Sequence, residues 1–319
     1  MPGVERALAL DLGGSRCRVA LVRRDGSLDR KETFPTPRSP SGGLRRLTEA
    51  VRSLLAAAGR DGVRGLGVGV AGPVERRTGT LRHPPNLPEW DGVSLKQAWG
   101  KEFGLPVHVG NDANLAAWGE YRYGAGRGAD HIVYLTLSTG IGGGVVIGGR
   151  LLEGALGYAG ELGHITIDRR GPRCTCGNVG CFEALASGTA IARRARRRLA
   201  GGAPSRLREL AKGEPKRIDA ALVARAAREG DPVARAVLEE AARAVGAGIV
   251  GLVHVFNPQR VIIGGGVGRA WPLLKPVVED YVRRYAMPPF REGLALVPSA
   301  LGDDAGLLGA AALVFEGQA

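Results

Sequence analysis

Lysine and aromatic residues are scarce in this sequence of 319 residues. Only six of the 44 basic residues are lysine, which leaves 38 arginines, and aromatic residues make up 5% of the chain. Long apolar runs are absent as well. None reaches the roughly 18 residues that a membrane helix needs, so no membrane partner is expected. The first residues also lack the charged-then-apolar pattern of a secretion signal, and a cytoplasmic protein is therefore the expectation.

The remaining composition is that of an ordinary soluble globular protein, with 44% hydrophobic and 24% charged residues. The length is sufficient for two domains that share a cleft. A net charge of +13 invites a nucleic-acid-binding hypothesis. The arginines are spread through every segment, however, and their densest run, residues 193–198, is more simply a solvated helix face. No nucleic-acid partner is expected, whereas a positive field suits an anionic nucleotide substrate.

Cysteine is rare, and its placement is informative. Three of the four cysteines, Cys174, Cys176 and Cys181, lie within eight residues of one another, and His164 precedes them by ten positions. Three thiolates and one imidazole are the four donors of a closed tetrahedral zinc site.

Two other interpretations of the cysteines are weaker. Buried free cysteines, which behave as small hydrophobic residues, do not suit a loop rich in Gly, Arg and Pro. A disulfide is disfavoured because nothing else marks the chain as secreted. Gly177 and Gly180 would let the backbone curl so that the sulfurs face one point. The flanking carboxylates of Glu161 and Glu183, held rigidly beside the imidazole, would suit the hydroxyls of a sugar.

Glycine clusters follow three predicted strands. The first is Gly13-Gly14-Ser15, which comes after Asp11, and the second is Ser138–Gly144, which starts 127 residues after Asp11 and repeats the same strand–turn–strand pattern. The third, residues 264–266, follows a β-branched run. Such turns can bring backbone amides close to phosphate oxygens, and Asp11 could hold magnesium through water. One such turn alone is usually only a turn, but three favour nucleotide binding. None fits the P-loop pattern.

Polar residues of two further segments are candidates for substrate contact. Asn111-Asp112 joins a strand to a helix, and a carboxylate at that end of a strand would face a ligand cleft and deprotonate a hydroxyl. The alternative is that Asp112 caps the helix. Asn86 lies in the proline-rich segment 83–90, where a hydroxyl ligand and a simple surface turn are equally plausible.

The rest of the chain is an alternation of strands and helices. Strands are expected at 6–12, 17–23, 63–72, 106–110, 134–137, 145–147, 261–263 and 294–297. A helix is expected at 41–59, and others at 94–103 and from residue 113 to about 124. The segment 187–256 is helical with breaks at 201–204 and 230–232. The last helix, 304–315, is rich in alanine and glycine, which favours close packing.

With these segments in view, the chain closely resembles the ROK family of sugar kinases and repressors, within the superfamily of actin and hexokinase. The resemblance covers essentially the whole chain and is strongest to the bacterial glucokinase branch. It is carried by the segments DLGGSR (11–16), NDAN (111–114), STGIGGG (138–144), ELGH (161–164) and CTCGNVGCFE (174–183). One departure is Ser15-Arg16 where Thr-Lys is usual, which keeps the hydroxyl and the positive charge.

The resemblance implies an α/β fold, the two-domain actin-like ATPase (ribonuclease H-like) fold with an interdomain cleft and a zinc-binding loop. The small α/β domain would comprise residues 1–112 and 300–319. The large α/β domain would comprise residues 113–299, including the zinc loop and the helical segment.

The resemblance also implies a role for each motif. Asp112 would be the catalytic base. The hexose would be bound by Asn86, Asn111, Asp112, Glu161, His164 and Glu183. Zinc would be held by His164, Cys174, Cys176 and Cys181, and would order the sugar-binding wall. ATP with Mg²⁺ would be bound by Asp11, Gly13, Gly14, Ser15, Arg16, Thr139, Gly140, Gly264, Gly265 and Gly266.

The expected activity is ATP-dependent phosphorylation of the 6-hydroxyl of glucose, by a homodimer or homotetramer. Mannose, fructose and N-acetylhexosamines remain open as substrates. A transcriptional repressor of the same family is the main alternative. Such repressors carry an N-terminal helix-turn-helix, for which no room is expected before a strand that starts near residue 6. A sugar sensor without catalysis is disfavoured by Asp112 and the two glycine loops.

Overall fold

The computed structural model describes residues 4–317 of the chain. The chain folds into two compact units. The first contains the residues up to Gly128, Gly144–Gly160 and the residues from Ala300 onward, and the second contains Ala129–Gly143 and Glu161–Ser299. As expected, the C-terminal helix belongs to the first unit. The division differs from the expected domains in that residues 113–128 and 144–160 also belong to the first unit, where the helix after Asp112 packs against that C-terminal helix.

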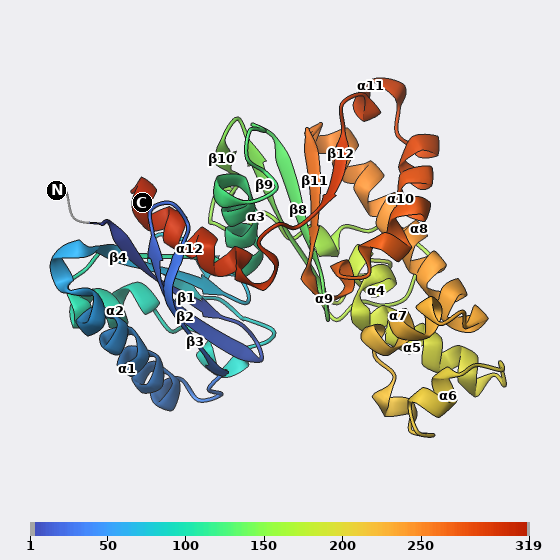
Figure 1. The fold of residues 1–319 in the computed structure, drawn as a ribbon, viewed down its shortest axis with the longest axis horizontal. Coiled ribbons are helices and arrows are strands. Elements are labelled where there is room, and N and C mark those ends of the chain that lie inside the picture. The colour runs from blue at the N-terminus through green and yellow to red at the C-terminus, as the bar shows by residue number, and fades with distance from the viewer. Residues whose placement is uncertain (1–3, 318–319) are drawn as a thin grey trace. The chain divides into compact units, whose positions relative to one another are not determined.

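The first unit is built on a five-stranded sheet in the order β3-β2-β1-β4-β7 (Figure 1). β1, β2 and β3 are antiparallel, with Asp25-Gly26 in the turn between β2 and β3, whereas β4 and β7 run parallel to β1. The strands are β1 (Arg6–Leu12), β2 (Arg16–Arg23), β3 (Leu28–Pro35), β4 (Val63–Val70) and β7 (Val107–Asn111).

The two faces of this sheet carry side chains of different size. Leu8, Leu10 and Leu12 alternate along β1 and share a buried cluster with residues of α1 (Pro40–Ala58) and α2 (Leu95–Phe103). On the opposite face, β1 and β4 carry the small residues Ala7, Ala9, Gly65 and Gly67, and helix α12 (Ala305–Glu316) packs against these two strands. A Cβ at Gly67 of β4 would stand 1.9 Å from the Ala310 carbonyl oxygen.

Helix α3 (Asp112–Tyr123) packs on α12 in the same close manner. A Cβ at Gly309 would stand 1.7 Å from the carbonyl oxygen of Leu115, and one at Gly119 would stand 2.2 Å from that of Ala305. The alanine- and glycine-rich composition of the last helix therefore predicts its packing correctly. Short elements complete the unit: η1 (Arg60–Gly62), β5 (Val74–Glu75), β6 (Thr80–Leu81), η2 (Pro88–Trp90), β10 (Arg150–Leu151) and η5 (Gly302–Asp304).

A second sheet has the order β10-β9-β8-β11-β12. Its strands β8 (Ile132–Leu137), β11 (Arg260–Gly264) and β12 (Ala295–Pro298) are parallel. β9 (Ile141–Ile147) follows β8 after the glycine turn, and the division between the units falls within it. The β-branched run before residue 264 is thus a buried central strand, as its composition predicts.

The helical segment of the second unit has the breaks expected from its glycines and prolines. α5 (Gly188–Ala200) ends before Gly201, and α8 (Pro232–Phe256) starts after the N-cap Asp231. Between them lie α6 (Leu207–Leu210), η4 (Pro215–Arg217) and α7 (Ala220–Arg228). The other helices of the unit are η3 (Leu162–His164), α4 (Phe182–Ala186), α9 (Gly265–Gly268), α10 (Trp271–Tyr285) and α11 (Pro288–Arg291).

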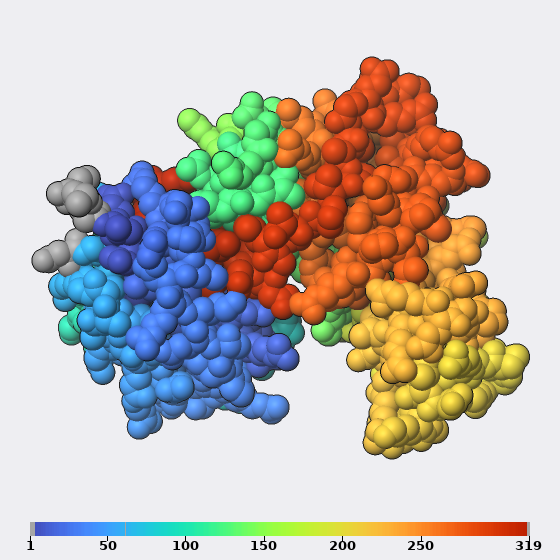
Figure 2. Space-filling view, in the orientation of Figure 1, coloured from blue at the N-terminus to red at the C-terminus, as the bar shows by residue number. Residues whose placement is uncertain are grey.

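The arginine run of α5 makes specific contacts within this unit. Arg193 donates to the Ala184 carbonyl oxygen at 2.7 Å, Arg196 donates to that of Ile218 at 2.7 Å, and Arg198 pairs with Glu240. Arg193, Arg196 and Arg197 are exposed, and the yellow to gold segment that follows α5 forms the lower part of the visible surface of this unit (Figure 2). These guanidinium groups thus connect neighbouring elements in addition to being hydrated. Along the stretch from residue 4 to 317, no helix is both long and apolar enough to span a membrane.

Candidate functional site

The first group of candidate residues lies where three parallel strands end. Leu12 of β1 is level with Val70 of β4, and Val70 is level with Asn111 of β7. The carboxyl ends of parallel strands meet at one edge of a sheet, which is where α/β folds bind ligands. Asp11, the first glycine loop and the Asn111-Asp112 pair therefore share one edge of the first unit.

The first glycine loop is a tight, exposed turn. The Gly13 amide donates to the Arg16 carbonyl oxygen at 3.2 Å, and Gly14, Ser15 and Arg16 are exposed. A Cβ at Gly14 would stand 2.9 Å from Cβ of Asn86. Asn86, proposed from the sequence as a hydroxyl ligand, thus lies against the loop proposed for phosphate, and only glycine leaves room for this approach.

Asp11 is buried beneath this loop, with 7% of its surface exposed. Its Oδ2 accepts a hydrogen bond from Arg18 Nη1 at 2.7 Å. Burial raises the pKa of the Asp11 carboxyl, and the Arg18 guanidinium opposes that rise. A carboxylate with a permanent cation beside it can remain charged in a buried position, which is what an indirect ligand of a magnesium–nucleotide complex requires.

Asn111 is the N-cap of α3. Its Oδ1 accepts hydrogen bonds from the amides of Ala113 (2.9 Å) and Asn114 (3.1 Å), and its Nδ2 donates to the Gly72 carbonyl oxygen at 3.2 Å. The N-cap of α3 is thus Asn111 and not Asp112, although Oδ1 of Asp112 also accepts from the Ala113 amide at 2.8 Å. Asp112 stands in the first helical turn, half-buried, where the helix dipole stabilises a carboxylate. One Nδ2 proton of Asn111 is left for a ligand.

The second glycine loop is anchored to the start of α5. The Ser138 carbonyl oxygen accepts from the Gly188 amide at 2.7 Å, and the Thr139 carbonyl oxygen accepts from Thr189 Oγ1 at 2.8 Å. Thr139 itself is exposed. Fixing these two carbonyls sets the orientation of the turn that Gly140 completes.

The third glycine cluster lies beside the second loop within the same unit. Gly264 is level with Thr136. Gly265 has φ +83°, and a Cβ there would stand 2.4 Å from the Leu137 carbonyl oxygen. A Cβ at Gly266 would lie 4.0 Å from Ser138 Oγ. The structure therefore brings together the two clusters of this unit that the sequence assigns to nucleotide.

The four expected metal ligands converge. The donor atoms of His164, Cys174, Cys176 and Cys181 all lie within 4.8 Å of one another. Cys174 Sγ is 3.7 Å from His164 Nδ1, and the sulfurs of Cys176 and Cys181 are 3.6 Å apart. A tetrahedral zinc ion with bonds of about 2.3 Å places sulfurs roughly 3.8 Å apart, so the spacing fits zinc. It is far longer than a disulfide bond of about 2.05 Å.

The loop that carries these ligands depends on its glycines. Gly180 has φ +66°, and a Cβ there would stand 1.6 Å from the Asp168 carbonyl oxygen. Gly177 has φ +93°. The Cys174 amide donates to the Asn178 carbonyl oxygen at 2.8 Å, which closes the turn between the cysteines. The curl predicted from the two glycines is thus confirmed.

The carboxylates on either side of the cluster have different surroundings. Glu161 is exposed, with Oε2 3.9 Å from His164 Nε2. Glu183 is half-buried; its Oε2 accepts from the Ile141 amide at 2.8 Å, while its Oε1 lies 3.9 Å from Cys174 Sγ. Glu183 therefore connects the cysteine loop to the second glycine loop. Sequence reasoning missed this contact because it joins segments 42 residues apart.

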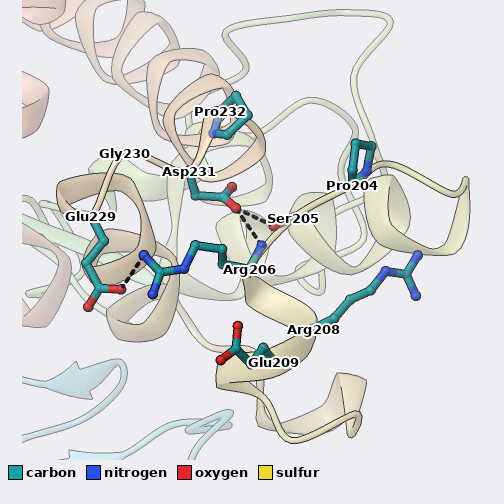
Figure 3. A pocket seen from close by; sticks show the side chains of 9 residues that line it. All are labelled: Pro204, Ser205, Arg206, Arg208, Glu209, Glu229, Gly230, Asp231 and Pro232. Carbon is teal, nitrogen blue, oxygen red and sulfur yellow. Dashed lines mark hydrogen bonds and ion pairs between the residues drawn. The ribbon is translucent and has the colours of Figure 1, made fainter.

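A cavity of about 480 Å³ lies elsewhere in the second unit and contains none of these residues (Figure 3). It is lined by residues 204–206, 208–209 and 229–232. Asp231 at its wall accepts from Ser205 Oγ and from the amides of Arg206 and Ala234, each at 2.8 Å. Arg206 also lies 3.4 Å from Glu229. The Asp231 carboxylate thus serves as the N-cap of α8 and holds the 205–206 turn, and none of the residues proposed from the sequence lines this cavity.

Comparison with known proteins agrees with the fold and these motifs. The chain is 40% identical to a glucokinase of Thermotoga maritima over 315 residues, which is 98% of each chain. Its structure is similar to a ROK family glucokinase from Streptomyces griseus in complex with glucose and AMPPNP (TM-score 0.83, 36% identity, 98% of this chain and 99% of that one).

A ROK family transcriptional regulator, a homologue of the E. coli MLC protein, is also similar (TM-score 0.86, 31% identity). That match covers 97% of this chain and 78% of the regulator. The α/β architecture with two sheets is thus the actin-like ATPase fold of ROK sugar kinases. The sequence model of the ROK family matches residues 7–316. The chain therefore belongs to the ROK family.

Proposed function

We propose that the protein is an ATP-dependent glucokinase, which transfers the γ-phosphoryl group of ATP to the 6-hydroxyl of glucose. The observation that carries this proposal is the environment of Asp112. Asn111 is the N-cap of α3. Asp112 follows it in the first helical turn, at the ligand-binding edge of the sheet, where its Oδ1 accepts from the Ala113 amide at 2.8 Å. The full-length similarity to glucokinases supports the choice of substrate.

Asp112 is proposed as the general base. It would accept the proton of the sugar 6-hydroxyl as that oxygen bonds to the γ-phosphorus, while the bond from the γ-phosphorus to the bridging oxygen breaks. The products are glucose 6-phosphate and ADP, and the proton on Asp112 then passes to solvent. The dipole of α3 stabilises negative charge in its first turn, where Asp112 stands.

The nucleotide is proposed to be held by the glycine clusters. Gly13, Gly14, Ser15 and Arg16 of the first unit, and Thr139, Gly140 and Gly264–Gly266 of the second, would offer backbone amides, hydroxyls and one guanidinium to the phosphates. When bound with the nucleotide, Mg²⁺ offsets the phosphate charge, and Asp11 would hold it through water.

The hexose is proposed to contact Asn86, Asn111, Asp112, Glu161, His164 and Glu183. Asn86 suits this role because it lies against Gly14, next to the proposed phosphate loop. His164 suits it because Nδ1 faces the cysteines, which leaves Nε2 on the side of Glu161. Glu161 is exposed and accessible to a hydroxyl.

Zn²⁺ is proposed as a structural ion held by His164, Cys174, Cys176 and Cys181. Three thiolates and one imidazole fill a tetrahedral shell, so the ion would contribute order to the loop and leave no position for a substrate. The spacing of the four donor atoms supports this assignment.

The proposal is tested by a coupled assay of ADP formation with glucose, mannose, fructose and N-acetylhexosamines. Glucose should give the highest kcat/KM. Turnover of a different hexose alone would keep the kinase and change its substrate, and turnover of none would refute the activity. A regulator is the second candidate, favoured by the similarity to the MLC homologue. Sequence-specific nanomolar binding to duplex DNA at physiological salt would favour it.

Location and assembly are proposed on other grounds. The sequence pattern favours the cytoplasm, and the resemblance to the ROK family implies a homodimer or homotetramer. Light scattering at several protein concentrations distinguishes the two assemblies and detects a monomer.

A further inference from the structure

Thr36 lies in the turn after β3 and contacts the first glycine loop twice. Its hydroxyl donates to the Gly13 carbonyl oxygen at 2.6 Å, and its backbone amide donates to the Ser15 carbonyl oxygen at 3.1 Å. The third bond of the loop, from the Gly13 amide to Arg16, is internal. One residue from another segment thus holds both ends of Gly13–Ser15.

These bonds determine which way the loop amides point. In a trans peptide, the C=O and N–H groups face opposite directions. Because the Gly13 carbonyl is directed at Thr36, the N–H of Gly14 in the same peptide is directed away from it. Gly14 is exposed, so its amide faces the side from which an anion can approach. Without the hydroxyl of Thr36, this peptide could rotate and present its carbonyl oxygen, which would repel a phosphate.

Thr36 is itself held in place from several sides. The buried Cys17 thiol donates to Thr36 Oγ1 at 3.5 Å, so the hydroxyl proton is directed to Gly13. Prolines on both sides restrict the backbone. Nε1 of the fully buried Trp90 is 3.3 Å from the Pro37 carbonyl oxygen and 3.1 Å from that of Arg38. This turn is therefore a fixed support for the loop.

We propose that Thr36 is a positioning residue for the phosphoryl donor, which it affects by holding the Gly14 amide toward the phosphates. The inference rests on the proposed function, in which Gly13–Ser15 binds the nucleotide. It concerns affinity for the nucleotide and leaves affinity for the hexose unchanged, because Thr36 contacts the loop through Gly13 and Ser15 and not through Asn86.

The test compares Thr36→Val, which keeps the shape and removes the hydroxyl, with Thr36→Ser, which restores it. Binding of a non-hydrolysable ATP analogue with Mg²⁺ is measured by calorimetry. Loss of one such hydrogen bond should weaken binding about tenfold in Thr36→Val, and Thr36→Ser should bind as the wild type does. Thr33→Val is the matched control, since Thr33 is an exposed threonine of β3, three positions before Thr36, and it should bind normally.

Hexose KM is measured on the same variants and should change less than twofold. Equal binding of the analogue by Thr36→Val and the wild type overturns the inference, as does a defect that Thr36→Ser does not correct. A wild type that binds nucleotide without phosphorylating any hexose contradicts the proposed function alone. If Thr36→Val does not fold, amide exchange in the wild type decides. The Gly14 amide should exchange more slowly when the analogue is added, and unchanged exchange overturns the inference.

Discussion

Oε2 of Glu183 accepts a hydrogen bond from the backbone amide of Ile141 at 2.8 Å, and a Cβ at Gly140 would stand 2.3 Å from the same oxygen. Glu183 follows the last cysteine of the metal cluster by two positions, and Ile141 begins β9 directly after the Thr139-Gly140 turn. A residue assigned to the sugar from its sequence motif is therefore also a support for the second glycine loop.

We expect Glu183→Ala to raise the KM for ATP and the KM for the hexose, each by about tenfold. The reason is that Oε2 of Glu183 accepts from the Ile141 amide of the glycine loop, whereas Oε1 is the oxygen proposed to bind the sugar. Glu161→Ala is the matched control. Glu161 lies beside His164 and, within residues 4–317, is not hydrogen-bonded to the glycine loop, so its loss should raise the hexose KM alone. Steady-state kinetics with each substrate varied separately measure both values. An unchanged KM for ATP in Glu183→Ala would show that the bond to Ile141 has no functional consequence.

The limits of sequence reasoning are visible at this residue. The motif around Glu183 is local, so its spacing indicates the metal cluster, and the four donor atoms do converge. The bond to Ile141 joins segments 42 residues apart, and no local pattern reports it. Thr36 is similar, because a threonine between two prolines suggests only a turn, and its contact with Gly13 follows from the pairing of β2 with β3.

Strands and turns are the part of the fold that local patterns predict well. Alternation of large and small residues identifies β1 and β4, but the reason for the small face is the approach of α12 from the far end of the chain. The sequence does not decide which residue caps α3, for a different reason. Asn111 and Asp112 are both good capping residues, and only the backbone geometry distinguishes them.

Asp112→Asn should lower kcat by roughly 10²–10⁴-fold with little change in hexose binding, since the amide keeps the shape of the side chain and cannot accept the proton. Glucose binding is measured by calorimetry on the same preparation, which controls for folding. Because Asn111 caps α3, the melting temperature should change little. Near-normal turnover at saturating substrates would remove Asp112 from the role of base.

Glu120 supplies a prediction about stability in the first unit. This fully buried carboxylate accepts from the amides of Ala125 (2.7 Å), Leu301 (2.9 Å) and Ala300 (3.2 Å). Glu120→Gln replaces one acceptor oxygen with an NH₂ group that faces backbone donors. We expect a loss of about 2–4 kcal/mol, seen as a melting temperature lower by roughly 3–6 °C.

The matched control for this change is Glu49→Gln, because Glu49 is exposed on α1 and surface substitutions usually change stability by less than about 0.5 kcal/mol. Equal melting temperatures for the two variants would show that the amides around Glu120 find other acceptors at no cost.

Removal of the proposed zinc ion tests the link between the cysteine loop and catalysis. Cys176 is the exposed member of the cluster, so Cys176→Ser removes one ligand with little effect on core packing. Because metal binding contributes to folding, the variant should hold less zinc and melt at a lower temperature. From the sequence alone, zinc loss is expected to raise the hexose KM far more than the KM for ATP. The contact of Glu183 with Ile141 changes this expectation, and both values should rise.

Zinc content, melting temperature and both KM values are measured on one preparation of Cys176→Ser, with Cys17→Ser as the control. Cys17 lies in β2 of the first unit, outside the cluster, so this change should leave zinc content unaltered. A zinc-free, folded sample with normal KM values for both substrates would show that the ion stabilises the loop and has no effect on substrate binding. A rise in the hexose KM alone would mean that Glu183 keeps its bond to Ile141 after the loop loosens, and that the ion orders only the His164 side of the site.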